Sequence, residues 1–201
     1  MPYFLRRTLI GGFTTLALVL TLSSCAQDEP ATVPETAAPA PAVDTSIPPR
    51  PTNIDPPPRP ELTGTSTAAL EQTARYFLEL YTYAAKTGDL IEWERLSHSD
   101  CVFCQEFIGR VEENNRTGAW TDMSLDVVDT AVFTVNQGNV DRRVDLLVQR
   151  SKLVEYTADG TDEVAPAQHA VIIGFVEENG QPVVKTFDIL KPDKFRAEVI
   201  D

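Results

Sequence analysis

Two cysteines three positions apart, Cys101 and Cys104, form the pattern in this chain most able to carry out chemistry. At the start of a helix, unpaired backbone amides and the helix dipole would lower the pKa of the first thiol, as thiol–disulfide exchange requires. Redox motifs of this kind usually follow a strand, however, and here a helical pattern precedes the pair. We therefore predict a structural disulfide that fixes the start of a helix, and keep a thiol redox site as the alternative.

The two histidines offer weaker candidates. His98 and Asp100 lie beside the cysteines, but no second pair of ligands is spaced to complete a tetrahedral zinc site, so we assign no metal. His169 lies in an apolar strand and could face a pocket, together with Trp93 and Tyr156. Residues of these types are more often part of a hydrophobic core. The three form our candidate pocket.

Acidic residues on the expected strands bear on the question of catalysis. Ketosteroid-isomerase chemistry needs a carboxylate base and an acid that stays neutral beside an oxyanion. Four strand residues could supply these groups, although each is explained equally well as an outward-facing polar residue: Asp126, Asp129, Asp145 and Asp188. The sequence has no glycine-rich phosphate loop, no nucleophile elbow and no zinc-protease motif. We therefore assign no catalytic residue and no cofactor.

The start of the chain predicts where the protein is located in the cell. Arg6 and Arg7 precede an apolar stretch, and small residues lead up to Cys25. This order is typical of a signal peptide, since the apolar stretch is shorter than the ~20 residues of a membrane-spanning helix. The run Leu22-Ser23-Ser24-Cys25 resembles the lipobox of bacterial lipoproteins. That resemblance implies removal of residues 1–24, acylation of Cys25 and a place on the outer face of the cytoplasmic membrane. A membrane-spanning anchor and a signal peptide without lipid are the alternatives.

Charge narrows the class of partner. The formal net charge is −13, and loss of Arg6 and Arg7 with the signal peptide would make it −15. A chain this acidic is repelled by nucleic acid phosphates and by anionic head groups, so we exclude nucleic acid. We expect attachment to the bilayer through acylated Cys25, with an envelope protein or a small apolar ligand as the partner of the folded part.

The next segment has a different composition. Eleven of the fifteen prolines lie between residues 26 and 60. Such a segment cannot bury enough apolar surface to fold and favours extended polyproline II conformations. We therefore predict three parts: a signal peptide at 1–24, a lipidated cysteine and disordered linker at 25–61, and a single domain at 62–201.

The periodicity of the remaining 140 residues predicts an α+β fold. Helical spacing of apolar residues indicates helices at about 66–86, 89–96 and 101–115. After Gly118 the period changes to two, which indicates strands at 123–135, 140–156, 168–176 and 183–190, with turns at 137–139, 158–161 and 179–180. In the first strand the apolar residues occupy odd positions, and we expect all of them to face the core. Three helices would then pack on a curved four-stranded antiparallel sheet.

This order of elements resembles the cone-shaped nuclear-transport-factor and ketosteroid-isomerase superfamily. A closer resemblance is to actinobacterial lipoproteins that share a domain of unknown function, and it covers about Thr65 to Leu190. The residues that carry it are Tyr76-Phe77, Tyr81-x-Tyr83-Ala84, Thr87-Gly88-Asp89, Leu96-Ser97 and Cys101-x-x-Cys104. The resemblance implies a cone-like domain but no activity.

These observations favour a membrane-tethered lipoprotein that acts as a non-catalytic binding or accessory module of the cell envelope. Two alternatives stay open, namely a pocket enzyme of the ketosteroid-isomerase type and a redox protein that uses Cys101 and Cys104.

Overall fold

The computed structural model describes residues 47–61, 64–135 and 140–197. The described residues all belong to one compact unit, Pro41–Asp201. The predicted signal peptide, Cys25, the first part of the predicted linker and the turn at 137–139 lie outside the described residues. No helix within the described ranges is long and apolar enough to cross a membrane.

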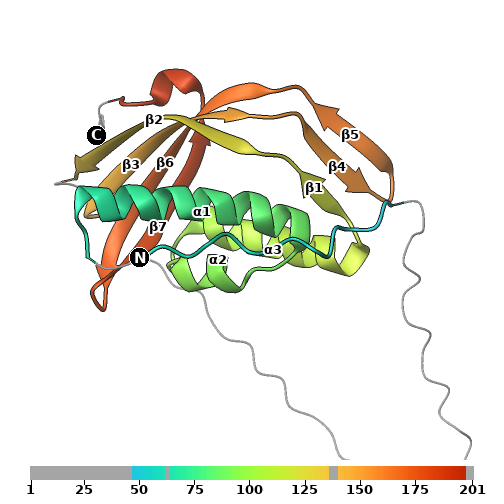
Figure 1. Cartoon of the computed structure of the whole chain (residues 1–201), viewed down its shortest axis with the longest axis horizontal. Coiled ribbons are helices and arrows are strands. Elements are labelled where there is room, and N and C mark those ends of the chain that lie inside the picture. The colour runs from blue at the N-terminus through green and yellow to red at the C-terminus, as the bar shows by residue number, and fades with distance from the viewer. Residues whose placement is uncertain (1–46, 62–63, 136–139, 198–201) are drawn as a thin grey trace, which may run out of the picture. The chain divides into compact units, whose positions relative to one another are not determined.

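Three helices begin the domain, as the periodicity predicted: α1 Thr67–Thr87, α2 Ile91–Leu96 and α3 Val102–Thr117. The Ser66 hydroxyl caps the start of α1 by accepting a hydrogen bond from the Ala69 amide. Gly88 ends α1 and Gly118 ends α3, both in the left-handed conformation that glycine adopts without strain. Figure 1 shows α1 running across the strands, with α2 and α3 below α1 in this view.

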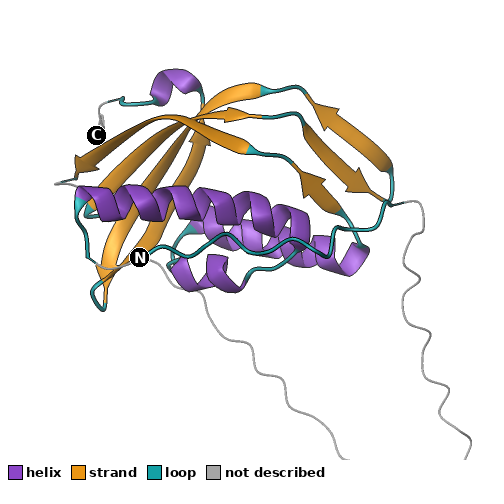
Figure 2. Cartoon of the chain, viewed as in Figure 1, coloured by secondary structure: helices purple, strands orange, loops and turns teal. Residues whose placement is uncertain are grey.

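The strands form two antiparallel sheets rather than one of four strands (Figure 2). The larger sheet has the order β2-β3-β6-β7, and the smaller has the order β1-β4-β5. The bounds are β1 Trp120–Asp122, β2 Leu125–Thr134, β3 Arg142–Arg150, β4 Leu153–Thr157, β5 Gly160–Val164, β6 Ala167–Glu178 and β7 Gln181–Leu190, followed by a short 3₁₀ helix, η1 Pro192–Lys194. The α+β class and the three helices are confirmed. The structure adds β1 and β5, and it divides the predicted strand 140–156 into β3 and β4.

The two sheets meet at the short connections between β1 and β2 and between β3 and β4. The Ser151 amide donates to the Ser124 carbonyl at 3.0 Å, and the Ser124 amide donates to the Ser151 hydroxyl at 2.9 Å. The Arg150 guanidinium donates to the Ser151 carbonyl at 3.0 Å and to the Ala165 carbonyl at 2.8 Å. Side chains thus satisfy backbone groups that the interrupted ladders leave free, and the strands curl from one sheet into the other.

A bulge in β2 corrects one expectation about the core. Val127 pairs with Val148 but Asp129 pairs with Leu147, so the register shifts at Val128. An extra residue in a strand moves every later side chain to the opposite face. Leu125 and Val127 therefore contact the core as predicted, whereas beyond the bulge Val132 does so. Phe133, predicted to be in the core, lies on the outer face with the Arg143 guanidinium 5.4 Å from its ring centre.

Aromatic side chains occupy the space between the helices and the sheet. The Phe77 and Trp93 rings stack with centres 4.0 Å apart, and Phe187 of β7 approaches both. The ring of Phe107 lies 4.7 Å from those of Trp93 and Tyr81. Burial of such large rings is the main stabilising contribution to a core of this size.

Residues 47–61, which we call the strap, lie against the domain. The Arg50 guanidinium donates to the carbonyls of Thr87 and Ala119 and to the Asn115 side chain, at the C-terminal ends of α1 and α3. The indole of Trp120 donates to the Pro48 carbonyl at 2.9 Å. The structure thus differs from the linker predicted up to residue 61. A polyproline segment makes no internal hydrogen bonds, so its carbonyls and side chains are available to a neighbouring surface.

Candidate functional site

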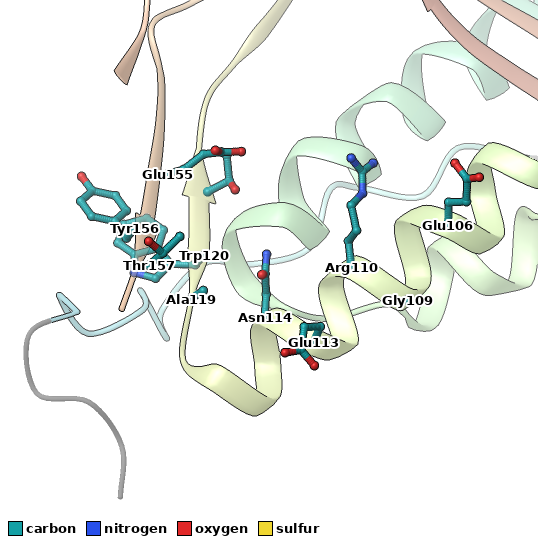
Figure 3. A pocket seen from close by; sticks show the side chains of 11 residues that line it. Glu106, Gly109, Arg110, Glu113, Asn114, Ala119, Trp120, Glu155, Tyr156 and Thr157 are labelled. Atoms are coloured by element: carbon teal, nitrogen blue, oxygen red, sulfur yellow. The ribbon is translucent and has the colours of Figure 1, made fainter. Parts of the chain in front are cut away.

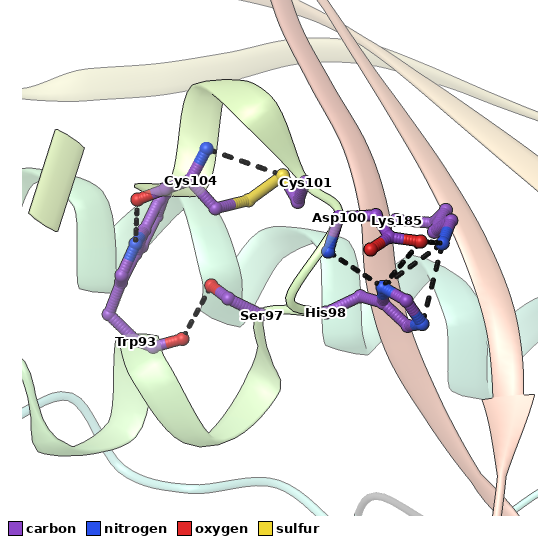
Figure 4. Close-up of a disulfide and its surroundings, with 7 residues drawn as sticks. All are labelled: Trp93, Ser97, His98, Asp100, Cys101, Cys104 and Lys185. Atoms are coloured by element: carbon purple, nitrogen blue, oxygen red, sulfur yellow. Dashed lines mark hydrogen bonds and ion pairs between the residues drawn. A yellow bond between two sulfur atoms is a disulfide. The ribbon is translucent and has the colours of Figure 1, made fainter. Parts of the chain in front are cut away.

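Cys101 and Cys104 form a disulfide at the start of α3, as predicted (Figure 4). Both residues are 0% exposed. The Cys101 sulfur accepts a hydrogen bond from the Cys104 amide, and the Cys104 carbonyl accepts one from the indole of Trp93 at 3.4 Å. The bridge therefore closes the first turn of α3 inside the core, and the Trp93 hydrogen bond joins this turn to α2. Both sulfurs are buried from solvent.

His98 lies in an ionic cluster rather than among metal ligands. Its Nδ1 atom accepts a hydrogen bond from the Asp100 amide, and its Nε2 atom is 3.2 Å from the Glu178 carboxylate. Figure 4 shows Lys185 of β7 beside this ring, and its ammonium lies 2.5 Å from the Asp100 carboxylate. The cysteine sulfurs are bonded to each other, so they cannot complete a zinc site with His98.

His169 lines a cavity on the inner face of the sheet, which we call the inner cavity. It has a volume of about 210 Å³. Its walls are mainly apolar and come from α1 and from both sheets: Tyr81, Met123, Leu125, Val148, Arg150, Leu153, His169, Val171 and Ile189. Among the described residues that line it, Tyr81, Arg150 and His169 are the polar ones, and none is an acid.

A larger, open cavity lies between α3 and the smaller sheet, and we call it the outer cavity. Its volume is about 650 Å³. Glu106, Arg110 and Asn114 follow one another at helical spacing and extend from α3 toward the same side (Figure 3). Thr121 and Glu155, which are directly opposite each other on β1 and β4, contribute to the facing wall. The outer cavity is thus polar where the inner one is apolar.

Tyr81 lines the inner cavity, and its hydroxyl is affected by two residues of the outer cavity. Burial raises the pKa of its hydroxyl, the neighbouring Arg110 acts in the opposite direction, and Glu155 adds to the increase. Arg110 and Glu155 line the outer cavity, whereas Tyr81 lines the inner one. The Tyr81 hydroxyl therefore stays protonated at neutral pH.

The other predicted pocket residues have different places. Trp93 is buried in the aromatic core and lines neither of these two cavities. Tyr156 does line the outer cavity, and its ring stacks on Trp120 of the neighbouring strand with centres 4.2 Å apart. Figure 3 places these two rings together at one end of the cavity. Sequence reasoning found His169 and Tyr156 but missed Arg110, Arg150 and Tyr81.

The strand acids are distributed on the outer face or near α3. Asp145 is 0% exposed, and the Arg143 guanidinium lies 2.6 Å from its carboxylate. The backbone amide of Arg196, beyond η1, donates to the same carboxylate, and the Arg196 side chain pairs with Asp129. Burial raises the pKa of Asp188. None of these acids lines the inner cavity, because the pleat of the sheet directs them away from it.

The fold and its cavities define an α+β protein in which three helices and a curled antiparallel sheet enclose a small apolar cavity with donor groups at its rim. The chain belongs to the family of unknown function DUF6318, whose sequence pattern matches residues 41–173. No curated protein matches the sequence.

Among solved structures, the intermembrane-space region of the chloroplast protein ARC6 has a TM-score of 0.50 and 10% identity, over 63% of this chain and 98% of that chain. A structure from Catenulispora acidiphila has a TM-score of 0.43 and 13% identity, over 64% and 95% of the two chains. The beta subunit of benzoate 1,2-dioxygenase from Burkholderia mallei has a TM-score of 0.42 and 14% identity, over 67% and 95%. At 10% identity the similarity to ARC6 concerns the fold alone.

Proposed function

We propose that this chain is an exported lipoprotein, anchored by acylated Cys25 to the outer face of the cytoplasmic membrane, whose domain is a non-catalytic binding module of the cell envelope. The domain would be a distant relative of the cone-shaped nuclear-transport-factor and ketosteroid-isomerase superfamily, with the inner and outer cavities as its binding region.

The composition of the inner cavity carries the non-catalytic part of the proposal. Isomerase and hydratase chemistry in a cone needs a base within hydrogen-bond reach of the substrate, usually a carboxylate. The described lining residues supply a protonated tyrosine, an arginine engaged by backbone carbonyls and one histidine. His169 has no carboxylate partner among the described ion pairs to orient it as a base. These groups can hold a ligand, but they do not form an acid–base pair.

The environment of the disulfide argues against the redox alternative. A redox-active cysteine pair needs an accessible sulfur that a partner thiolate can attack. Cys101 and Cys104 are fully buried at the start of α3. We therefore expect the purified protein not to reduce or reoxidise insulin. Turnover of insulin disulfides by the protein, abolished in a Cys101→Ala/Cys104→Ala variant, would contradict the binding-module proposal.

Metabolic labelling with an alkyne fatty acid tests the anchor. Wild-type protein should incorporate the label and sediment with membranes, and the Cys25→Ala variant should lose the label. The Cys101→Ala variant is the matched control because it removes a cysteine of the folded domain, and it should keep the label. Equal labelling of the wild type and of Cys25→Ala would refute lipid attachment at this residue.

A further inference from the structure

We propose that the inner cavity binds a small amphipathic anion, specifically a short-chain or aryl carboxylate. The apolar part of this ligand would occupy the inner cavity, and its carboxylate would lie at the rim formed by Arg150, Tyr81 and Arg110. The inference rests on the proposed binding function and names the chemical class of the ligand.

A buried positive charge is the first argument. Arg150 is 8% exposed and lines the inner cavity. Its guanidinium donates to backbone carbonyls of Ser151 and Ala165, which are dipoles without net charge. No described carboxylate lies within ion-pair distance of it, although the chain has 30 acidic and 17 basic residues. A buried charge is costly unless an opposite charge accompanies it, so an anion in the cavity would supply the missing partner.

The other polar groups at the rim favour the same sign of ligand. The Tyr81 hydroxyl stays protonated and can donate a hydrogen bond. The ring of Tyr81 lies 4.7 Å from that of Phe107, and the Arg110 guanidinium lies 5.8 Å from the same Phe107 ring, so the two side chains share a neighbour. The Arg110 guanidinium also lies 5.8 Å from the ring centre of Phe103, and Arg110 lines the outer cavity. Glu155 lines the outer cavity and would repel the carboxylate of the ligand. It therefore favours a ligand whose charged end stays near Arg150 and Arg110.

The size of the cavity limits the apolar part of the ligand. Six residues supply its apolar surface: Met123, Leu125, Val148, Leu153, Val171 and Ile189. A dry apolar cavity of roughly 150 Å³ holds one benzene molecule. At about 210 Å³ the inner cavity has room for one ring or a chain of similar size, but not for a full-length lipid chain.

Three six-carbon probes of equal size separate charge from shape: hexanoate, hexan-1-ol and hexylammonium. Each is titrated by NMR into the fragment 41–201, the compact unit to which all described residues belong. The amide signals of His169, Ala170 and Val171 report on the inner cavity. We expect hexanoate to bind about tenfold more tightly than hexan-1-ol, the effect of one charge-assisted hydrogen bond, and hexylammonium to bind most weakly.

Variants assign the preference to the rim. Arg150→Met should abolish the preference for hexanoate while the binding of hexan-1-ol persists. Since Arg150 also stabilises the junction of the two sheets, Tyr81→Phe and Arg110→Gln provide a test that does not depend on its folding. Each should weaken hexanoate binding about three- to tenfold and change hexan-1-ol binding less than about twofold. Glu112→Gln is the matched control, since it removes an exposed acid of α3 that lines neither cavity, and it should not weaken hexanoate binding.

Three results would overturn the inference: equal binding of hexanoate and hexan-1-ol, tightest binding of hexylammonium, or no shift of the inner-cavity signals with any probe. The labelling and insulin experiments do not depend on these titrations. Failure here therefore rejects the ligand class and leaves the anchored, non-catalytic module to be judged by those two tests.

Discussion

The Arg50 contacts allow the role of the strap to be tested by one substitution. The Arg50→Ala variant removes a guanidinium that donates to the Thr87 and Ala119 carbonyls and to the Asn115 side chain. Burial lowers the pKa of Arg50, because the surrounding protein replaces part of its hydration. The same residue lies so close to Gly88 that a Cβ there would overlap both the Arg50 guanidinium and the Asn115 amide. Arg50 is thus enclosed by two helix ends.

The size of the effect follows from the environment of the three acceptors. Hydrogen bonds to a charged group contribute about 1.5–3 kcal/mol each when the acceptor stays buried. The Asn115 contact is exposed and the other two are partly buried, so water would replace much of what is lost. We therefore expect Arg50→Ala to lower the free energy of unfolding by about 2–3 kcal/mol. For a domain of this length, this corresponds to a decrease in Tm of roughly 5–10 °C.

The matched control is the second arginine of the strap. Arg59 lies 3.8 Å from the Glu92 carboxylate, and its side chain is 47% exposed. Arg59→Ala should therefore cost less than about 1 kcal/mol. Urea unfolding and calorimetry of the three proteins give the comparison directly. If Arg50→Ala is no less stable than Arg59→Ala, the strap does not stabilise the domain and our account of these contacts is wrong.

Two further predictions concern buried titratable groups. Asp145→Ala leaves the Arg143 guanidinium without its partner and should lower the free energy of unfolding in urea by about 3 kcal/mol. Asp129→Ala breaks an exposed ion pair and should lower it by less than about 1 kcal/mol. Equal losses would contradict the burial argument. Burial, reinforced by the Glu92 carboxylate, raises the pKa of Tyr76 to about 12, above its unfolded value of 10.0. The unfolded chain therefore loses this proton first, and stability should fall as pH rises from 10 toward 12; Tyr76→Phe should reduce that slope, and an unchanged slope would refute the assignment.

The helices were predictable because their signals are local. Ser66, the apolar spacing of α1 and Gly88 each act within a few residues, so the start and end of α1 follow from the sequence alone. The bulge at Val128 leaves no comparable signal, since Val127 and Val128 are both good strand residues. The face of the sheet on which Phe133 lies could be assigned only once the pairing of β2 with β3 was known. The strap was missed for a related reason, because proline-rich composition is the same in a free linker and in a docked polyproline segment.

The candidate site was predictable only in part. His169 stood out because a polar residue in an apolar strand is unusual, and it does line the inner cavity. Tyr81 was indistinguishable from a core residue of α1, and Arg150 from an exposed strand end. Their convergence depends on the curl between the two sheets, which places α1, β3 and β6 around one space. No periodicity within a single element reports such a convergence.

The strap also determines the point at which a pulling force on the N-terminal side of the chain would act on the domain. A pull transmitted along the chain from its N-terminal side reaches Pro48 and Arg50 before it reaches Ser66, the first capping residue of α1. The force is therefore applied where the strap is fastened to the C-terminal ends of α1 and α3, not at the N-terminal turn of α1, where a helix frays most easily. Detachment of Arg50 would pass the load to the rest of the strap, including the pair of Arg59 with Glu92, before α1 itself came under tension. The strap contacts should thus break before the helices unfold. In single-molecule pulling, the wild type should show one small, early rupture that the Arg50→Ala variant lacks.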